Sequence, residues 1–167
     1  MSRASFQSND SREKGISIVG LITIHQRILG VDYGSERVGL SLSDPLGLIA
    51  RPMPAMKNTA DLVTRLQQFS NMEHVNLIVV GMPYNLKGQV AQKAEKVQKF
   101  VTVLRETTGM EVVTWDERFT TTIAHKTMHI MGTKKKERQK KDGRIDSMAA
   151  AIMLQGYLDR QNQSRID

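Results

Sequence analysis

The sequence predicts a single α/β domain built on a mixed β-sheet with helices on both faces. Two observations lead to this fold class. The first third of the chain carries three short strand patterns with no helix between them, and strand and helix periodicities then alternate towards the C-terminal end. Strands joined by short turns pair antiparallel, whereas strands connected through a helix are parallel. The length of 167 residues suits one domain, and the apolar fraction of 40% is typical of a chain with a buried core.

The first three strands are expected to form a meander. Residues 28–33 are a short apolar run, and residues 37–43 alternate between apolar and small or polar side chains. Only the turn at residues 34–36 separates them, so we expect an antiparallel hairpin. A third strand is expected around residues 47–53, after Pro45 has ended the second.

The rest of the chain alternates between helix and strand patterns. Apolar residues at helical spacing predict a helix over residues 59–72, and a continuous apolar run predicts a strand over 77–82. Steps of four, three, four and three from Val90 to Leu104 indicate the most regular helix, which Gly109 ends. The remaining expected elements are a strand at 111–115, a helix at 120–131, a basic loop at 132–143 and a helix at 144–158. The predicted order is β-β-β-α-β-α-β-α, with five strands in one sheet.

The two ends of the chain are expected to lie outside this domain. We expect a flexible extension at residues 1–26, the domain at 27–160 and a short tail at 161–167. Residues 16–24 have the length of a secretory apolar segment, but no small-residue cleavage site follows, which makes a signal peptide the weaker alternative. No apolar run reaches the roughly 18–20 residues that span a bilayer. The chain has no cysteine, which excludes thiol catalysis and a disulfide scaffold and suits a reducing compartment. Together these observations favour a cytoplasmic protein without a membrane partner.

Positive charge is concentrated in one stretch. The net charge is +7, and residues 134–144 contain seven basic and two acidic side chains, so that this stretch carries +5 and the other 156 residues carry +2. A local basic stretch on a nearly neutral domain points to a polyanionic partner, either nucleic acid or an anionic membrane surface. The ordinary alternative is a solvated charged loop.

Acidic side chains fall where the predicted strands and the last helix meet. Asp32 lies within an apolar strand, where a carboxylate costs several kcal/mol unless it is paired or holds a metal ion. Asp116 and Glu117 follow the strand at 111–115, and Asp146 lies in the first turn of the last helix. Ala149, Ala150 and Ala151 would allow that helix to approach the sheet closely.

We therefore expect a cation site at this edge of the sheet. The carboxyl ends of parallel strands share one edge, and several carboxylates there repel one another unless a cation joins them. Oxygen ligands without His or Cys indicate Mg²⁺ or Mn²⁺. Two such ions, roughly 3.5–4 Å apart, can support phosphodiester hydrolysis. Taken singly, Asp146 also suits a helix N-terminus, Asp116 a turn and Glu117 a surface pair with Arg118, whereas Asp32 has no such ordinary explanation.

Other polar or small residues are expected around this site. Gly81 and Pro83 shape a strand-to-helix loop that would border it, and Arg37 either contacts phosphate or lies on the hairpin surface. Thr120 and Thr121 either cap a helix or hold a phosphate at its N-terminus.

Four segments taken together resemble the YqgF/RuvX family, whose RNase H-like fold is related to the RuvC resolvases. They are GVDYGSERVG at 30–39, VVGMP at 79–83, DERFTT at 116–121 and IDSMAA at 145–150. The resemblance covers about residues 27–160 and implies an RNase H-like domain. It also implies that Asp32, Glu117 and Asp146 are the catalytic, metal-binding acidic triad, with Asp116 as a further candidate ligand.

The resemblance implies a metal-dependent endonuclease that processes the 5′ end of precursor 16S rRNA in ribosome biogenesis. Its expected partners are structured RNA or branched DNA, and pre-ribosomal particles, with the protein as a monomer or a homodimer. The alternatives are a DNA nuclease like a Holliday-junction resolvase, a non-catalytic ribosome-assembly or transcription factor, and an ATPase of the sugar-kinase type. The residues expected to contact the substrate are Arg37, Gly81, Pro83, Arg118, Thr120, Thr121, Lys134, Lys135, Lys136 and Lys140.

Overall fold

The fold contains a mixed five-stranded sheet with helices on both faces, as the sequence predicts. The structure is a computed structural model and describes residues 18–19, 22–23, 27–83, 92–116 and 143–164. The sheet order is β5-β4-β3-β6-β7, and a separate two-stranded sheet pairs β1 (Ile18–Val19) with β2 (Ile22–Thr23). The strands of the larger sheet are β3 (Arg27–Tyr33), β4 (Arg37–Ser43), β5 (Ala50–Lys57), β6 (Val75–Met82) and β7 (Glu111–Asp116). The helices are α1 (Leu62–Met72), α2 (Gln92–Thr108) and α4 (Arg144–Gln163).

The meander β3-β4-β5 is antiparallel throughout. Its first hairpin is formed as expected, but the third strand occupies Ala50–Lys57 instead of residues 47–53. The difference arises in the preceding loop, where the Asp44 carboxylate accepts hydrogen bonds from the backbone N–H groups of Leu46, Leu48 and Ile49 at 3.1, 2.7 and 2.7 Å. These bonds hold the loop up to residue 49 and delay the strand. Pro52 and Pro54 fit β5 because it is an outer strand with one unpaired side.

The parallel half consists of β3, β6 and β7, with β6 in the middle. Gly30 of β3 is opposite Val79 of β6, and Met82 of β6 is opposite Asp116 of β7. The three strands therefore end at the same edge of the sheet. This edge is where the sequence places its acidic residues.

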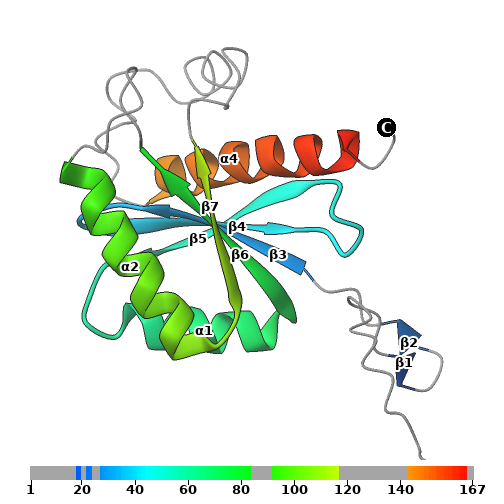
Figure 1. Ribbon diagram of the computed structural model, residues 1–167, viewed down its shortest axis with the longest axis horizontal. Helices are drawn as coiled ribbons and strands as arrows, with labels where there is room; N and C mark the ends of the chain where they lie inside the picture. The colour runs from blue at the N-terminus through cyan, green and yellow to red at the C-terminus, as the bar shows by residue number, and fades with distance from the viewer. Residues whose placement is uncertain (1–17, 20–21, 24–26, 84–91, 117–142, 165–167) are drawn as a thin grey trace, which may run out of the picture.

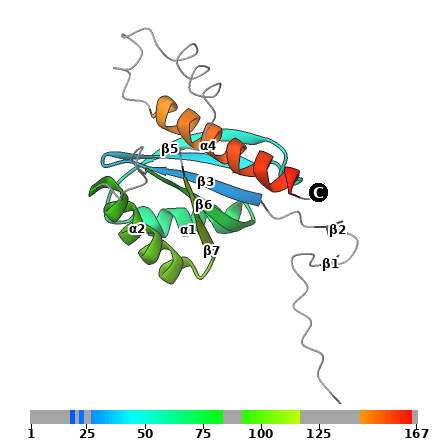
Figure 2. The same cartoon turned by 45° about the horizontal axis from the view of Figure 1, so that its top comes forward.

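The helices form a layer on each side of the sheet. Figure 2 shows α4 over one face, with α1 and α2 over the other. Figure 1 shows α2 and α4 reaching the same end of the sheet from these two sides. The core between the sheet and α1 and α2 is built from buried aliphatic residues such as Leu29, Leu66 and Leu104, and a second cluster under α4 contains Met153, Leu154 and Leu158. No helix within the described ranges is long and apolar enough to cross a membrane.

Helix α4 lies unusually close to β3 and β4 because small residues face it. A Cβ atom on Gly39 would overlap the carbonyl oxygen of Asp146, and one on Gly30 would overlap the Ser41 hydroxyl. The Ser41 hydroxyl, which is fully buried, donates a 2.9 Å hydrogen bond to the Ala150 carbonyl oxygen. The close approach expected from the alanines of this helix is thus confirmed at Ala150, which is also fully buried.

Some sequence predictions lie outside the described residues. These are the helix at 120–131, nearly all of the basic loop at 132–143 and most of the extension at 1–26. The last helix is longer than expected, because α4 continues to Gln163 and so includes part of the segment predicted as a tail.

The contact at Gly39 predicts a large effect of one methyl group. Gly39→Ala should lower the free energy of unfolding by about 3 kcal/mol, because α4 cannot keep its position against the added carbon. Gly156→Ala, within α4 itself, is the control. The added Cβ would lie 3.9 Å from the nearest atom, and the change should stabilise the helix by about 0.5–1 kcal/mol. Urea unfolding followed by circular dichroism measures both. Equal stabilities of the two variants would contradict the packing described here.

Candidate functional site

Two of the predicted acidic residues meet where β3 ends and α4 begins. Asp32 is opposite Gly39 in the β3-β4 register, and the backbone of Asp146 lies directly against Gly39. Gly30 faces Leu154 and the Ala150 carbonyl oxygen of α4, and residues two apart on a strand share a face, so Asp32 is also directed to the α4 face. The glycine contact therefore places the two carboxylates side by side.

The electrostatic surroundings of Asp32 reflect this arrangement. Burial raises the pKa of the Asp32 carboxyl above its ordinary value, the Lys93 ammonium lowers this pKa in part, and the Asp146 carboxylate raises it again. The loss of hydration therefore disfavours the charged form of Asp32 by more than the attraction of Lys93 favours it. A carboxylate held in this way is typical of functional sites.

Of the other two predicted metal ligands, the structure describes only Asp116. Asp116 ends β7, and β6 separates that strand from β3. Within the described ranges no three His, Cys, Asp or Glu side chains are grouped as a metal site, so Asp116 is not a third member beside Asp32 and Asp146. Glu117 follows Asp116 but lies outside the described residues, and its role in the triad stays a prediction.

Of the predicted substrate-contacting residues, the structure describes three, and all lie near this end of the sheet. Arg37 begins β4, and its Cδ lies 3.6 Å from where a Cβ of Gly143 would be, next to the start of α4. Gly81 and Pro83 lie at the carboxyl end of β6. The remaining ones lie outside the described residues: Arg118, Thr120, Thr121, Lys134, Lys135, Lys136 and Lys140.

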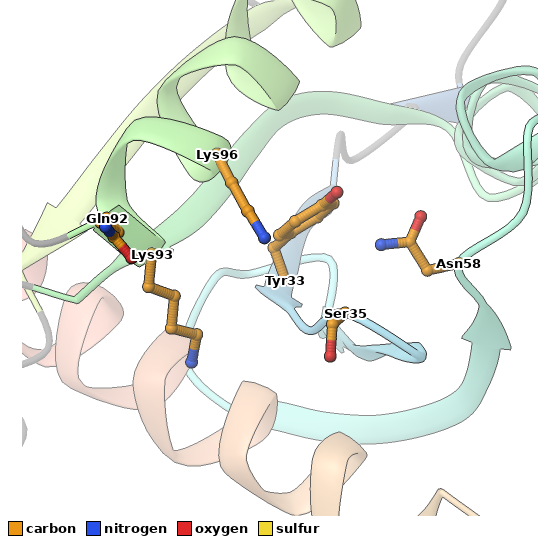
Figure 3. Close-up of a pocket in the computed structure, with 6 residues that line it drawn as sticks. All are labelled: Tyr33, Ser35, Asn58, Gln92, Lys93 and Lys96. Carbon is orange, nitrogen blue, oxygen red and sulfur yellow. The ribbon is translucent and has the colours of Figure 1, made fainter.

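A cavity of about 440 Å³ lies between α2 and the β3-β4 turn and was not anticipated from the sequence. Figure 3 shows Lys96 extending from α2 towards Tyr33, whereas Lys93 extends from the same helix towards α4, and Ser35 lies on the β3-β4 turn. Asn58 and Gln92 complete the described lining. In the sequence, only the two lysines near the start of the helix that follows the Gly-Met-Pro loop could have indicated this cavity. Their spacing of three residues is equally typical of a solvated helix face.

The site can hold a divalent cation and a phosphate. Asp32 and Asp146 offer carboxylate oxygens, the ligands that Mg²⁺ and Mn²⁺ prefer, and their mutual repulsion is the condition that a bound cation relieves. The lysines of α2 supply positive charge on the other side of Asp32.

Comparison with known proteins gives the family of the chain and its fold. The family model described as "RuvX: Holliday junction resolvase" matches residues 26–160. Two relatives named "Putative pre-16S rRNA nuclease" are similar to the chain over most of its length. The protein from Ruminiclostridium cellulolyticum is 39% identical over 137 residues, covering 80% of this chain and 94% of the relative. The protein from Desulforamulus reducens is 41% identical over 135 residues, covering 80% and 96%.

Solved structures confirm the fold class. The RuvC structure from Thermus thermophilus superposes with a TM-score of 0.52 at 14% identity, covering 81% of this chain and 97% of that one. The same protein in complex with a Holliday junction gives a TM-score of 0.50 at 17% identity. At these identities the similarity is one of fold, and it confirms the predicted RNase H-like sheet.

The environment of Asp32 predicts that the carboxylate destabilises the metal-free protein. Asp32→Asn should raise Tm by about 2–4 °C at neutral pH without divalent metal, or about 1 kcal/mol for a domain of this size. Because the pKa of Asp32 is raised in the folded state, its ionisation opposes folding, and the gain should shrink as the pH falls through that pKa and the wild-type carboxyl becomes neutral. Asp159→Asn, at an exposed position of α4, should change Tm little. Calorimetry at several pH values tests this, and a lower Tm for Asp32→Asn at neutral pH would contradict it.

Proposed function

The chain belongs to the RuvX family, and from this premise we propose that it is a metal-dependent endonuclease that hydrolyses phosphodiester bonds in structured RNA, with precursor 16S rRNA as its substrate. The observation that carries the proposal is the placement of Asp146 beside Asp32 by the Gly39 contact. A purely structural domain has no use for two adjacent carboxylates, one of them desolvated.

We assign the cation to Asp32 and Asp146, with Glu117 as the third ligand and Asp116 as a neighbouring acidic group. Mg²⁺ or Mn²⁺ bound there would supply Lewis acidity and a water of lowered pKa for attack on phosphorus. The protein's own contribution is rigidity: β3 fixes Asp32, and α4 fixes Asp146 through its backbone contact with Gly39. Both carboxylates are thus held in place before a cation arrives, which limits reorganisation on binding.

Positive side chains around the carboxylates are assigned to the nucleic acid. Lys93 is close enough to Asp32 to influence its pKa, and Arg37 lies at the start of β4 near α4. The basic stretch Lys134–Lys136 with Lys140, together with Arg118, Thr120 and Thr121, is assigned to the phosphate backbone from its charge and position in the sequence. Gly81 and Pro83 border the site without adding charge.

RNA is favoured over branched DNA as the substrate. The relatives named for pre-16S rRNA match 80% of this chain at 39–41% identity, whereas the RuvC structures match at 14–17% and share the fold alone. A Holliday-junction resolvase activity is the second candidate, because the description of the family model names it. A non-catalytic binding factor is disfavoured by the carboxylate pair. Action on pre-ribosomal particles in the cytoplasm, as a monomer or a homodimer, completes the proposal.

The first test is cleavage by wild-type protein and by Asp32→Asn. A precursor 16S RNA with its 5′ leader and a four-way DNA junction are incubated in parallel with Mg²⁺, with Mn²⁺ and with EDTA. We expect metal-dependent cutting of the RNA that falls at least about 100-fold in Asp32→Asn, because even outer-shell changes at metal sites cost 10–100-fold. RNA binding by the variant should be retained, since only one negative charge is removed.

Asp159→Asn is the control and should cut like the wild type. Cutting of the junction alone would replace the RNA substrate by branched DNA. Binding of RNA without any cutting would indicate the non-catalytic factor, and unchanged cutting by Asp32→Asn would remove Asp32 from the mechanism.

A second test concerns the basic stretch. Replacement of Lys134, Lys135 and Lys136 by Ala should weaken RNA binding and reduce the slope of log K against log salt by about 2, since each lost phosphate contact removes about 0.7–0.9 from the slope. Arg51→Ala is the comparison, because Arg51 is exposed on β5 opposite Leu42, towards the other end of the sheet. Filter binding at several salt concentrations measures the slope. A slope in the triple variant equal to that of Arg51→Ala would place the RNA elsewhere.

A further inference from the structure

We propose that the cavity between α2 and the β3-β4 turn is a subsite for a backbone phosphate of the substrate strand, next to the phosphate that is cut at Asp32 and Asp146. This inference rests on the proposed function, since it takes the carboxylate pair as the place of cleavage. It assigns a ligand to a cavity of about 440 Å³ that the metal site itself does not use.

The charge of the cavity favours an anion. Its described lining contains Lys93 and Lys96 and no carboxylate (Figure 3). The two lysines are three residues apart on α2 and so lie on the same side of the helix. Arg27 pairs with Glu73 and Arg65 with Asp61, whereas neither Lys93 nor Lys96 forms an ion pair with another residue that the structure describes.

The polar walls of the cavity are held in place by the fold. The Asn58 side-chain amide donates a 2.8 Å hydrogen bond to the Gly34 carbonyl oxygen, and the Asn58 backbone N–H donates to the Glu36 carbonyl oxygen at 2.9 Å. Both bonds fasten the turn that carries Ser35. The Tyr33 ring packs on Phe100 of α2, with ring centroids 4.5 Å apart. A ligand therefore meets a preformed surface with hydroxyl and amide groups, as small-molecule sites usually provide.

The position of the cavity favours a phosphate of a nucleic-acid strand over a free phosphate ion as its ligand. Tyr33 follows Asp32 directly, and successive strand residues point to opposite faces, so the cavity lies across the strand end from the carboxylates. Lys93 lines the cavity and is also close enough to Asp32 to lower its pKa. A strand that crosses this end of the sheet with one phosphate at the carboxylates brings a neighbouring phosphate to the lysines. The cavity would then add binding energy and set the direction of the substrate strand across the site, because two anchored phosphates define that direction.

Lys96→Ala combined with single-phosphate neutralisation tests the subsite. A series of RNA substrates is prepared, each with one uncharged methylphosphonate linkage at a different position. Their binding is measured with Asp32→Asn protein, so that no RNA is cut, and their cleavage is measured with protein that keeps Asp32. In the Lys96-containing proteins we expect one position next to the cut where neutralisation weakens binding and raises KM about 10-fold, the loss typical of a charge-assisted hydrogen bond. In the Lys96→Ala proteins, neutralisation at that position should have no further effect, whereas the other positions should behave as before.

Lys99→Ala, at an exposed α2 position outside the cavity lining, is the matched control and should keep the wild-type pattern. Lys96→Arg should restore most of the binding, and kcat should change less than about twofold in Lys96→Ala because Lys96 does not contact the reacting atoms. The same neutralisation pattern in Lys96→Ala as in wild type would overturn the subsite. Inorganic phosphate is also tested, at the same concentration as the phosphates of the RNA. If it occupies the cavity as fully as the RNA does, the cavity is a site for a free ion instead.

The two proposals fail separately. Suppose that the wild type cuts no RNA, but that neutralisation at one position weakens binding when Lys96 is present and has no effect in Lys96→Ala. That result would overturn the nuclease and keep the phosphate subsite as part of a binding surface. Cutting without that pattern would keep the nuclease and overturn the subsite.

Discussion

The arrangement of this molecule depends on a backbone-to-backbone contact between α4 and the β3-β4 hairpin. Gly39 allows the Asp146 carbonyl to lie against β4, Gly30 accommodates Leu154, and the Ser41 hydroxyl binds the Ala150 carbonyl oxygen. Ordinary side chains at these strand positions would push the helix outward, because a close-packed interior has no room to absorb them. The contact fixes both the depth of α4 and its position along the sheet. The carboxylate of its first turn therefore reaches the end of β3.

The site lies at the end of the sheet, where groups from both helical layers can meet. Asp146 comes from the α4 layer and Lys93 from the α2 layer, while Asp32 sits on the strand between them. The raised pKa of Asp32 shows that the fold maintains this arrangement at a cost, mainly through burial. A marginally stable domain can keep such a destabilising group where a bound ligand stabilises the folded state. A cation at the carboxylates and phosphates beside the lysines are ligands of suitable charge.

Much of this arrangement is predictable from the sequence because it follows from periodicity. The apolar runs of β3 and β6 and the regular spacing of α2 predict the sheet and its helices. The alanines of α4 predict the close approach that brings Asp146 near Asp32. Three features escape such reasoning. The start of β5 depends on hydrogen bonds of the Asp44 carboxylate, which leave no periodic trace. Asp116 stays apart because the sheet order places β6 between β3 and β7. The cavity collects residues from distant segments, and only the tertiary fold brings Lys96 to Tyr33.

The two prolines of β5 have a consequence for how copies of the protein meet. An outer strand with free N–H groups is a template on which a strand of another molecule can grow, the first step of edge-to-edge aggregation. Pro52 and Pro54 are two residues apart and have no N–H to offer, so they interrupt the donor row on one side of this strand. Neighbouring copies of the protein would thus lack a continuous edge through which their sheets could pair at β5. The outer strand farthest from β7 therefore opposes edge-to-edge pairing with another sheet.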